Sequence, residues 1–387
     1  MGDCTAAGPS PMAAAPAGKA TQRRPRMSAM ALAAAALGLA LGCGRVASPN
    51  PGGAAAAPAA APVAAAPVAA GPAAAAPAVA APAACASGTC YVAVSVATVW
   101  VKPRYPRAVD KPALGNPAHP QLWVRAMTVA QKSWLVGRLE TQALYGTKVT
   151  VTGHWRNWTQ VAVPSQPTNR DRRGYPGWVP TVQLTRTAPP AAATSAVIRS
   201  QAAWLWSRWT AGGVAGTKMM LVSYDTRLPV VLAAATYVEV TLIGGQKAAV
   251  RRGDVVLHGA GSSWGATRAR VVAEARKFLR LPYLWAGTSG FGYDCSGFTY
   301  SVYHSYGLTL SRDADQQAVH GTVIARSGLQ PGDLVFFRNS TNGPISHVGM
   351  YVGGGTMIDA PHTGAVIRID PVSSFAYYAG ARRYLSR

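Results

Sequence analysis

Acidic residues are scarce in this sequence of 387 residues, where 14 Asp and Glu stand against 37 Lys and Arg and give a formal net charge of +23. A charge excess of this size suits a polyanionic partner, either an anionic cell envelope or nucleic acid. The sequence has no helix-turn-helix, zinc-finger or aromatic RNA-binding motif, and its basic residues are scattered. We therefore expect diffuse attraction to an anionic envelope and no nucleic acid partner.

Cysteine is also rare, with five residues, and no C-x-x-C or H-x-x-x-H pair accompanies the cysteine and histidines near the C-terminus. This spacing argues against a zinc site, and we expect no metal or organic cofactor. Cys85 and Cys90 stand close together in Cys-Ala-Ser-Gly-Thr-Cys. In an exported protein they are expected to form a small disulfide loop, with two free thiols as the alternative.

The N-terminal part contains an uncharged run of 16 residues, Met27 to Gly42, which is short for a membrane-spanning helix. Because basic residues precede this run, residues 1–46 are predicted to be an export signal. Leu39-Ala40-Leu41-Gly42-Cys43 also resembles a bacterial lipobox, although Ala40 stands where leucine is usual. Membrane attachment through a lipidated Cys43 and simple secretion both remain open.

Residues 47–90 are dominated by Ala, Pro and Gly. We expect an extended linker there, because proline recurs too often for a helix. In the next stretch, 91–190, short segments rich in Val, Trp and Thr alternate with turns, and no amphipathic helix of useful length appears. This pattern predicts a small β-barrel, and a second β-rich stretch follows at 195–260.

Near the C-terminus, Tyr293-Asp294-Cys295-Ser296-Gly297-Phe298 joins a Gly-rich loop to a helical pattern. Apolar residues at 298, 302, 303 and 306 recur with the period of a helix, which Gly307 is placed to stop. Cys295 then lies in the first turn, where free N–H groups and the helix dipole favour the thiolate. The pattern predicts a nucleophilic cysteine.

A predicted strand at 345–352 places His347 and Gly349 on one face, and the glycine leaves room for a helix end to come close. After a turn at 353–355, the chain leads to His362, whose imidazole is placed to orient the first one. We predict Cys295 as nucleophile, His347 as general base and His362 as the orienting residue. The alternatives are an inert buried cysteine and zinc binding by the three side chains.

Five ordered motifs in residues 264–387 resemble the NlpC family of bacterial cell-wall cysteine peptidases. They are Leu281-Pro282-Tyr283-Leu284-Trp285-Ala286-Gly287, Asp294-Cys295-Ser296-Gly297-Phe298, Ser311-Arg312-Asp313, Leu329-Gln330-Pro331-Gly332-Asp333-Leu334-Val335-Phe336-Phe337 and His347-Val348-Gly349-Met350-Tyr351. The resemblance implies an α+β papain-like domain, whose nucleophile begins a helix that packs on an antiparallel sheet.

The same resemblance implies roles for further residues. Tyr283 would help to form the oxyanion hole, and the substrate side of the cleft would be lined by Asp294, Ser296, Arg312 and Asp313. Relatives often carry serine after the Arg-Asp pair, where this sequence has Ala314.

Segments at 94–100, 140–146 and 174–179 resemble the SH3-like domain that precedes the catalytic domain in some enzymes of this kind. The implied chain is multidomain, with two SH3-like β-barrels followed by the catalytic domain. In the similar enzymes, an acidic residue and a tyrosine of the first barrel hold the free α-amine of the substrate. The matching positions here are Glu140 and Tyr175, for which a solvated barrel residue and a turn aromatic are the alternatives.

The implied reaction is hydrolysis of a peptidoglycan stem peptide between D-glutamate and the diamino acid, through a thioester on Cys295. The expected partners are peptidoglycan stem peptides (muropeptides), with preference for a free N-terminal L-alanine. The expected location is the cell envelope, secreted or lipid-anchored. The alternatives are a general hydrolase of intact peptidoglycan, a thioester acyltransferase on the same fold, a zinc-dependent amidase and a wall-binding protein with an inactive site.

Overall fold

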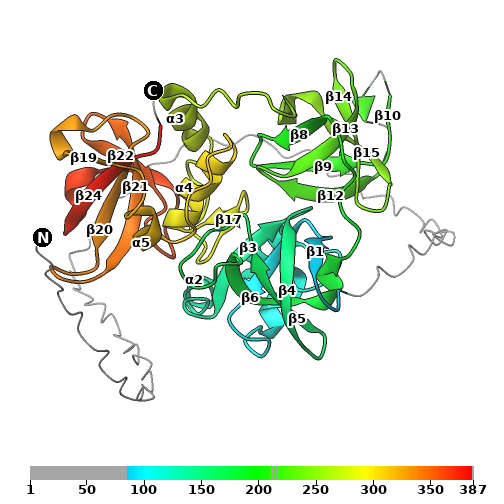
Figure 1. Cartoon of the computed structure of the whole chain (residues 1–387), viewed down its shortest axis with the longest axis horizontal. Helices are drawn as coiled ribbons and strands as arrows, with labels where there is room; N and C mark the ends of the chain where they lie inside the picture. The colour runs from blue at the N-terminus through cyan, green and yellow to red at the C-terminus, as the bar shows by residue number, and fades with distance from the viewer. Residues whose placement is uncertain (1–84, 211–212, 215, 386–387) are drawn as a thin grey trace, which may run out of the picture. The chain divides into compact units, whose positions relative to one another are not determined.

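The computed structural model describes residues 85–385 except 211, 212 and 215, and these belong to one compact unit (Figure 1). The predicted export signal with Cys43 and nearly all of the predicted linker lie outside the described residues. Within the described part of the chain, no helix is long and apolar enough to cross a membrane. Cys85 and Cys90 form a disulfide, as predicted.

The first module is a seven-stranded antiparallel sheet with the strand order β3-β2-β6-β5-β4-β1-β7. Its strands are rich in β-branched and aromatic residues, which fit a pleated surface buried on one face. Fully buried side chains such as Val99, Val149 and Val161 form its core. The strands are β1 Thr89–Val92, β2 Val96–Trp100, β3 Leu139–Leu144, β4 Lys148–Trp155, β5 Trp158–Val163, β6 Tyr175–Pro180 and β7 Leu184–Thr185.

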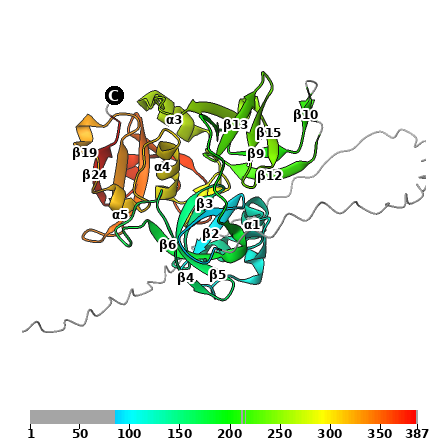
Figure 2. The ribbon, with the colours of Figure 1, turned by 45° about the vertical axis from the view of Figure 1, so that its right-hand side comes forward.

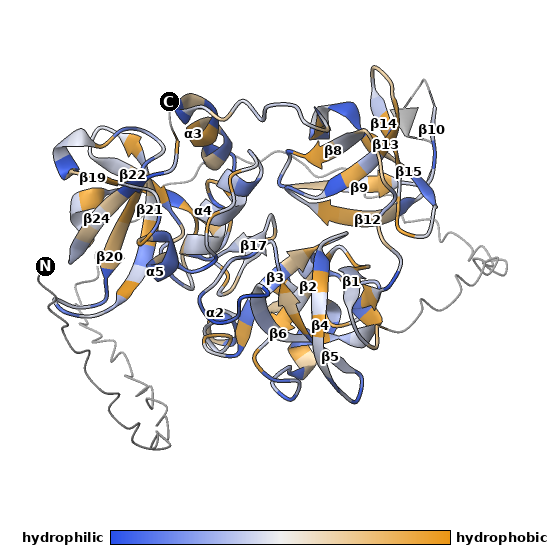
Figure 3. Ribbon diagram, viewed as in Figure 1, coloured by the Kyte–Doolittle hydropathy of each residue, from blue (hydrophilic) through white to orange (hydrophobic). Residues whose placement is uncertain are grey.

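The second module repeats this topology. Its order, β12-β9-β15-β14-β13-β8-β16, is identical to that of the first sheet when strands are matched along the chain and a small inserted hairpin is set aside. Figure 3 shows hydrophobic residues along β9 and β12. The strands are β8 Thr194–Ile198, β9 Ala202–Trp206, β12 Lys218–Ser223, β13 Arg227–Ala233, β14 Tyr237–Thr241, β15 Lys247–Arg251 and β16 Val255–Gly259.

Both sheets end in the same way. A 3-10 turn, η2 Thr181–Gln183 in the first module and η3 Arg252–Asp254 in the second, precedes a last strand that pairs with the first strand. In the described residues, β3 and β7 are the end strands of the first sheet, and β12 and β16 are those of the second. The modules predicted as barrels are therefore seven-stranded sheets with two ends.

Each module carries an insertion between its second and third matched strands. The first has η1 Ala108–Ala113, α1 Pro120–Ala126 and α2 Val129–Ser133, and the second has the hairpin β10 Trp209–Thr210 and β11 Gly213–Val214. The helices α1 and α2 are too short for a periodic pattern, so the sequence analysis does not find them. The available signal is the capping box at α2, where Thr128 and Gln131 accept hydrogen bonds from each other's backbone N–H groups.

The C-terminal module combines helices with a six-stranded antiparallel sheet of order β19-β24-β20-β21-β22-β23. Helix α4 begins at Cys295 and strand β21 covers the predicted segment. Both ribbon views show α4 beside this sheet (Figure 2). The elements are α3 Arg268–Arg276, β17 Thr288–Ser289, β18 Gly292–Tyr293, α4 Cys295–His304, α5 Ala314–Gln317, β19 Thr322–Ile324, η4 Arg326–Gly328, β20 Leu334–Arg338, β21 Ile345–Gly353, β22 Thr356–Asp359, β23 Arg368–Pro371, η5 Val372–Ser374 and β24 Tyr378–Arg383.

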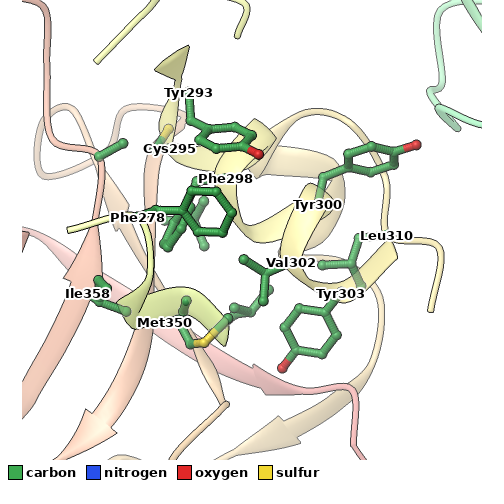
Figure 4. Close-up of a cluster of buried hydrophobic side chains, with 14 of the residues drawn as sticks. Phe278, Tyr293, Cys295, Phe298, Tyr300, Val302, Tyr303, Leu310, Met350 and Ile358 are labelled. Carbon is green, nitrogen blue, oxygen red and sulfur yellow. The ribbon is translucent and has the colours of Figure 1, made fainter. Parts of the chain in front are cut away.

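Helix α4 contributes to a buried hydrophobic cluster that also contains residues of the sheet (Figure 4). Phe278, Tyr293 and Phe298 are fully buried, and the rings of Phe278 and Tyr293 meet edge to face with centroids 5.2 Å apart. Strand residues such as Met350 and Ile358 cover the opposite side of the cluster. This packing fixes the helix that carries the predicted nucleophile.

The C-terminal end of α4 is held by the second module. The guanidinium of Arg199 donates hydrogen bonds to the Ser305 hydroxyl, at 2.7 Å, and to the Ser305 carbonyl, at 2.8 Å. Tyr224 donates to the same hydroxyl at 2.6 Å. These side chains are buried, so the bonds satisfy polar groups at the helix end that solvent does not reach. The repeated module therefore contributes to the position of α4.

At the other end of α4, Gly297 allows a close backbone contact. A Cβ atom there would lie only 2.0 Å from the carbonyl oxygen of Gly287. We predict that Gly297→Ala moves the start of α4, destabilises the fold by about 1–3 kcal/mol and lowers the melting temperature by about 2–10 °C. Gly253→Ala is the matched control, since nothing lies within 4 Å of a Cβ at that site. Equal melting temperatures for both variants would contradict the close contact.

Candidate active site

Cys295 is the first residue of α4, and Asp294 is its N-cap. The Asp294 side chain accepts a hydrogen bond of 2.6 Å from the Gly297 backbone N–H. This cap explains why the helix begins at the cysteine, because an aspartate in that position satisfies an N–H group without an intrahelical partner. Cys295 is nearly buried, with 8% of its surface exposed. Its place in the first turn puts the side chain at the positive end of the helix dipole.

His347 lies on β21 and links Cys295 to a buried carboxylate. Its Nε2 is 2.8 Å from Oδ2 of Asp359, the last residue of β22. The imidazole is also hydrogen-bonded to Cys295. Because Nε2 faces Asp359, the ring nitrogen that is left for Cys295 is Nδ1. Burial lowers the pKa of His347, but the hydrogen bonds and charges of Asp359 and Cys295 outweigh burial and raise it to about 9. The raised pKa therefore favours the protonated imidazolium at neutral pH.

The prediction that His362 orients His347 is wrong, because the structure gives this contact to Asp359. His362 is exposed in the turn beyond β22, and its Nδ1 lies 3.0 Å from the Thr363 carbonyl oxygen. The β21–β22 register pairs Met350 with Ile358, which places Asp359 opposite Gly349 and diagonal to His347. A strand–turn–strand pattern alone does not fix these neighbours, because the register shifts between Tyr351 and Gly353.

The His347 ring is packed against an aromatic ring, and the next residue on its face of β21 is a closely packed glycine. Phe375 stacks on it with a centroid distance of 4.8 Å and an interplanar angle of 3°. A Cβ at Gly349 would lie 2.4 Å from the Met357 sulfur and 3.3 Å from Cβ of Asp359. The glycine thus makes room for β22 side chains, and not for the helix end that the sequence analysis expects.

Tyr283 is buried next to the nucleophile. Burial raises the pKa of its hydroxyl well above the usual value, and the nearby charges of Cys295 and Asp294 raise it further. The hydroxyl therefore stays protonated and is available as a hydrogen-bond donor. A protonated donor beside the sulfur suits the oxyanion role predicted for Tyr283.

Arg312 binds two residues at the start of α4. Its guanidinium donates to both carboxylate oxygens of Asp294, at 3.1 and 2.6 Å, and to the Ser296 hydroxyl at 3.1 Å. Its Nε donates to the Thr141 hydroxyl of the first module at 3.0 Å. Only 1% of Arg312 is exposed, so its side chain does not line the cleft as predicted. It is a buried partner that holds Asp294 and Ser296.

Asp313 and Tyr175 connect the catalytic module to the first module. The Tyr175 hydroxyl lies 3.0 Å from each carboxylate oxygen of Asp313, to which it donates. Burial raises the pKa of both groups, so the tyrosine hydroxyl remains a donor. Ala314, which follows Asp313 where relatives often carry serine, is buried and offers no hydroxyl.

Glu140, on β3 of the first module, forms a bidentate ion pair. Arg170 donates from Nη1 to Oε2 at 2.5 Å and from Nη2 to Oε1 at 2.7 Å. The Glu140 side chain is 11% exposed, so it is not the solvated barrel residue of the alternative interpretation. No motif in the sequence points to Arg170, because the pairing joins the loop after β5 to a strand 30 residues earlier.

A cysteine at a helix start, a histidine on the neighbouring sheet and a buried carboxylate behind it define a cysteine peptidase site. The described residues include no group of three or more His, Cys, Asp or Glu side chains placed to hold a metal ion. The chain belongs to the NlpC/P60 family, whose model matches residues 280–383. The protein is therefore an enzyme of the cysteine peptidase class.

Similarity to known proteins extends well beyond the catalytic module. The chain is 39% identical over 305 residues to a gamma-D-glutamyl-L-lysine dipeptidyl-peptidase of Bacillus cereus, covering 76% of this chain and 90% of the relative. It is 37% identical over 289 residues to the enzyme with the same name from Bacillus subtilis, covering 74% and 94%. A crystal structure of an NlpC/P60 family protein from Bacillus cereus matches with a TM-score of 0.72 and 38% identity, covering 77% of this chain and 99% of that chain.

We predict that Asp359→Ala lowers kcat/KM by about 10²-fold or more, because an unsupported imidazole loses its orientation and its charge partner. Asp359→Asn should retain more activity, since an amide oxygen still accepts from Nε2–H. His362→Ala is the control and should keep nearly full activity. Steady-state kinetics of the three variants would reject the assignment if His362→Ala were the most damaging.

The raised pKa of His347 predicts a pH dependence. The imidazolium contributes fully to stability below the ordinary pKa of 6.5, and this contribution is lost as the pH rises through about 9. Because catalysis needs the same ion pair, kcat/KM should fall as the pH rises through about 9. Asp359→Asn removes a negative partner and should move this alkaline limb towards neutral pH. A pH profile of kcat/KM with an unmoved limb would contradict the pairing.

Proposed function

We propose that this enzyme hydrolyses peptidoglycan stem peptides at the bond between D-glutamate and the diamino acid, and that it acts on stems with a free N-terminal L-alanine. The observation that carries the proposal is the group of carboxylates beside the nucleophile. Glu140, Arg170, Tyr175 and Asp313 form one hydrogen-bonded chain across two modules, and Arg312, the neighbour of Asp313 in the sequence, binds Asp294. A peptide with a terminal ammonium is the substrate that such a group of carboxylates would attract.

The names of the relatives support the same substrate. A dipeptidyl-peptidase removes two residues from a free N-terminus, and the Bacillus enzymes are named for a gamma-D-glutamyl-L-lysine bond. Both relatives are covered almost completely by this chain, so the similarity includes the first module as well as the catalytic one. A substrate that must be held at its N-terminus needs a contact at a fixed distance from the sulfur, and the first module is suited to supply it.

In the proposed reaction, the Cys295 thiolate attacks the carbonyl carbon at the scissile bond and forms a tetrahedral oxyanion, to which the Tyr283 hydroxyl donates. His347 gives its proton to the leaving amine, and a thioester remains on the sulfur. The neutral His347 then takes a proton from water, which attacks the thioester and releases the acyl product. Asp359 holds the imidazole ring in place during both steps.

The first two modules serve in this proposal as SH3-like domains, which fits their short antiparallel strands and their shared topology. The first would select the substrate and the second would brace α4 through Ser305. We also propose that the protein is exported to the cell envelope, either secreted or attached through a lipid on Cys43. A disulfide between Cys85 and Cys90 is compatible with an oxidising compartment.

A pair of peptides tests the proposed function. We expect the free tripeptide L-alanyl-γ-D-glutamyl-diamino acid to be cut at least tenfold better than its N-acetylated form, because acetylation removes the ammonium. Cys295→Ala should abolish turnover, whereas Cys85→Ala should retain it. Glu140→Ala should lower kcat/KM for the free peptide and leave the acetylated one unchanged.

Identification of the fragments by mass spectrometry separates the alternatives. Hydrolysis gives the dipeptide acid, whereas acyl transfer to an added amine would indicate an acyltransferase. Equal rates on both peptides would mean that the enzyme acts on intact peptidoglycan and that the first module does not bind the free amine.

A further inference from the structure

The loop between β5 and β6, residues 164–174, carries a guanidinium to the carboxylate proposed to hold the substrate amine. Arg170 binds both oxygens of Glu140. The same Nη1 lies 3.2 Å from the Tyr175 hydroxyl oxygen, to which it donates, and the guanidinium carbon is 5.1 Å from the centre of the tyrosine ring. The Arg170 side chain therefore donates hydrogen bonds to the oxygens of both Glu140 and Tyr175.

The two partners of this ion pair differ in exposure. The Glu140 side chain is 11% exposed, whereas that of Arg170 is 41% exposed. Glu140 lies on a strand, and a Cβ at neighbouring Gly177 would lie 3.4 Å from its Cγ, so the carboxylate is fixed by the sheet. Arg170 comes from a loop and can leave into solvent, where its charge is hydrated. Half-exposed ion pairs of this kind contribute little free energy and are exchanged readily for another cation.

The balance of charge among these side chains also favours exchange. Glu140, Asp294 and Asp313 are opposed by Arg170 and Arg312. Arg312 is buried, bidentate with Asp294 and bound to Thr141, so it cannot leave without exposing an unpaired buried charge. Arg170 is the cation of this group that can move. When it leaves, the acidic partner that it neutralised becomes available.

We propose that Arg170 is a resident cation that occupies the amine site of the free enzyme and is displaced by the N-terminal ammonium of the substrate. Arg170 thereby acts as a specificity-determining residue and as an autoinhibitory contact. A substrate with a free amine binds Glu140 only when its ammonium replaces the Arg170 guanidinium. A substrate without an amine leaves the Arg170–Glu140 pair in place. This inference rests on the proposed function, because it requires that Glu140 is the site of the amine.

The matched control is Arg173, which lies on the same loop. It carries the same charge, but its guanidinium pairs with Asp171, at 2.8 Å, within the loop itself. Arg173→Ala therefore changes the net charge and the loop composition as Arg170→Ala does, without changing the contacts of Glu140. Arg170→Lys retains a charge but loses the planar fork that binds both oxygens.

The experiment measures KM and kcat of the whole protein for the free and the N-acetylated tripeptide. Arg170→Ala should lower KM for the free peptide by about twofold to fivefold, the effect of removing one competing ion pair, with kcat within about twofold. Arg170→Lys should lie between Arg170→Ala and the unmodified enzyme. Arg173→Ala should match the unmodified enzyme on both peptides, and no variant at position 170 should change the acetylated peptide.

An unchanged or higher KM for the free peptide in Arg170→Ala would overturn the inference, and a higher KM would make Arg170 a support of Glu140. Calorimetric titration of the free tripeptide into Cys295→Ala, with and without Arg170→Ala, tests the exchange without turnover and should show tighter binding in the double variant. If the unmodified enzyme cuts both peptides equally, the proposed function fails and this inference fails with it. If it prefers the free peptide and Arg170→Ala changes nothing, only the role of Arg170 is rejected.

Discussion

The buried ion pair between Arg312 and Asp294 is the interaction on which the rest of the site depends. Asp294 caps the helix that begins with the nucleophile, and it can do so only while Arg312 compensates its charge. Removal of one partner from a buried pair costs on the order of 3–5 kcal/mol, because the other charge remains without compensation. Arg312 is in turn held by Thr141 and by the carbonyl of Pro167, which accepts from its backbone N–H at 2.9 Å. The position of Cys295 therefore depends on a module outside the catalytic one.

This dependence explains why the site is built between modules. Two hydrogen-bonded groups meet here: Glu140, Arg170, Tyr175 and Asp313 form one, and Arg312, Asp294 and Ser296 form the other, beside Cys295. Asp313 follows Arg312 in the chain, and the charge of Arg312 acts on the Asp313 carboxylate. Each link joins a charged group to a partner of opposite charge or to a hydroxyl, so a change at one end alters the electrostatic environment of the other. The low exposure of Arg312 and Tyr175 limits screening by water and keeps these interactions strong.

The two sheets ahead of the catalytic module have one topology and different tasks. The first acts on the N-terminal end of α4 indirectly, because Thr141 binds Arg312, which holds the N-cap Asp294. The second contacts the C-terminal end directly, through Arg199 and Tyr224. They differ most in their insertions, which are helical in the first module and a hairpin in the second. Repetition of one sheet therefore supplied two supports for a single helix, and the differences lie in loops, where sequence change disturbs packing least.

Part of this arrangement is local and was predictable from the sequence. The apolar period after Cys295 and the stop at Gly307 predict α4, and alternation around His347 predicts β21, because both patterns depend on residues near each other in the chain. The motifs also identify Cys295 and His347 as partners. The two modules were predicted as β structure, but the short helices of the first insertion have no periodic signal and were not found.

The sequence by itself therefore determined the helix, the strands and the identity of the nucleophile and its histidine. Only the tertiary structure decided that Asp359, and not His362, supports His347, that Arg312 is buried beneath Asp294, and that Arg170 covers Glu140. These contacts depend on strand register and on loops that meet residues far away in the chain. The sequence around a charged residue does not differ between a solvated side chain and one that forms an ion pair. Only packing in three dimensions distinguishes the two.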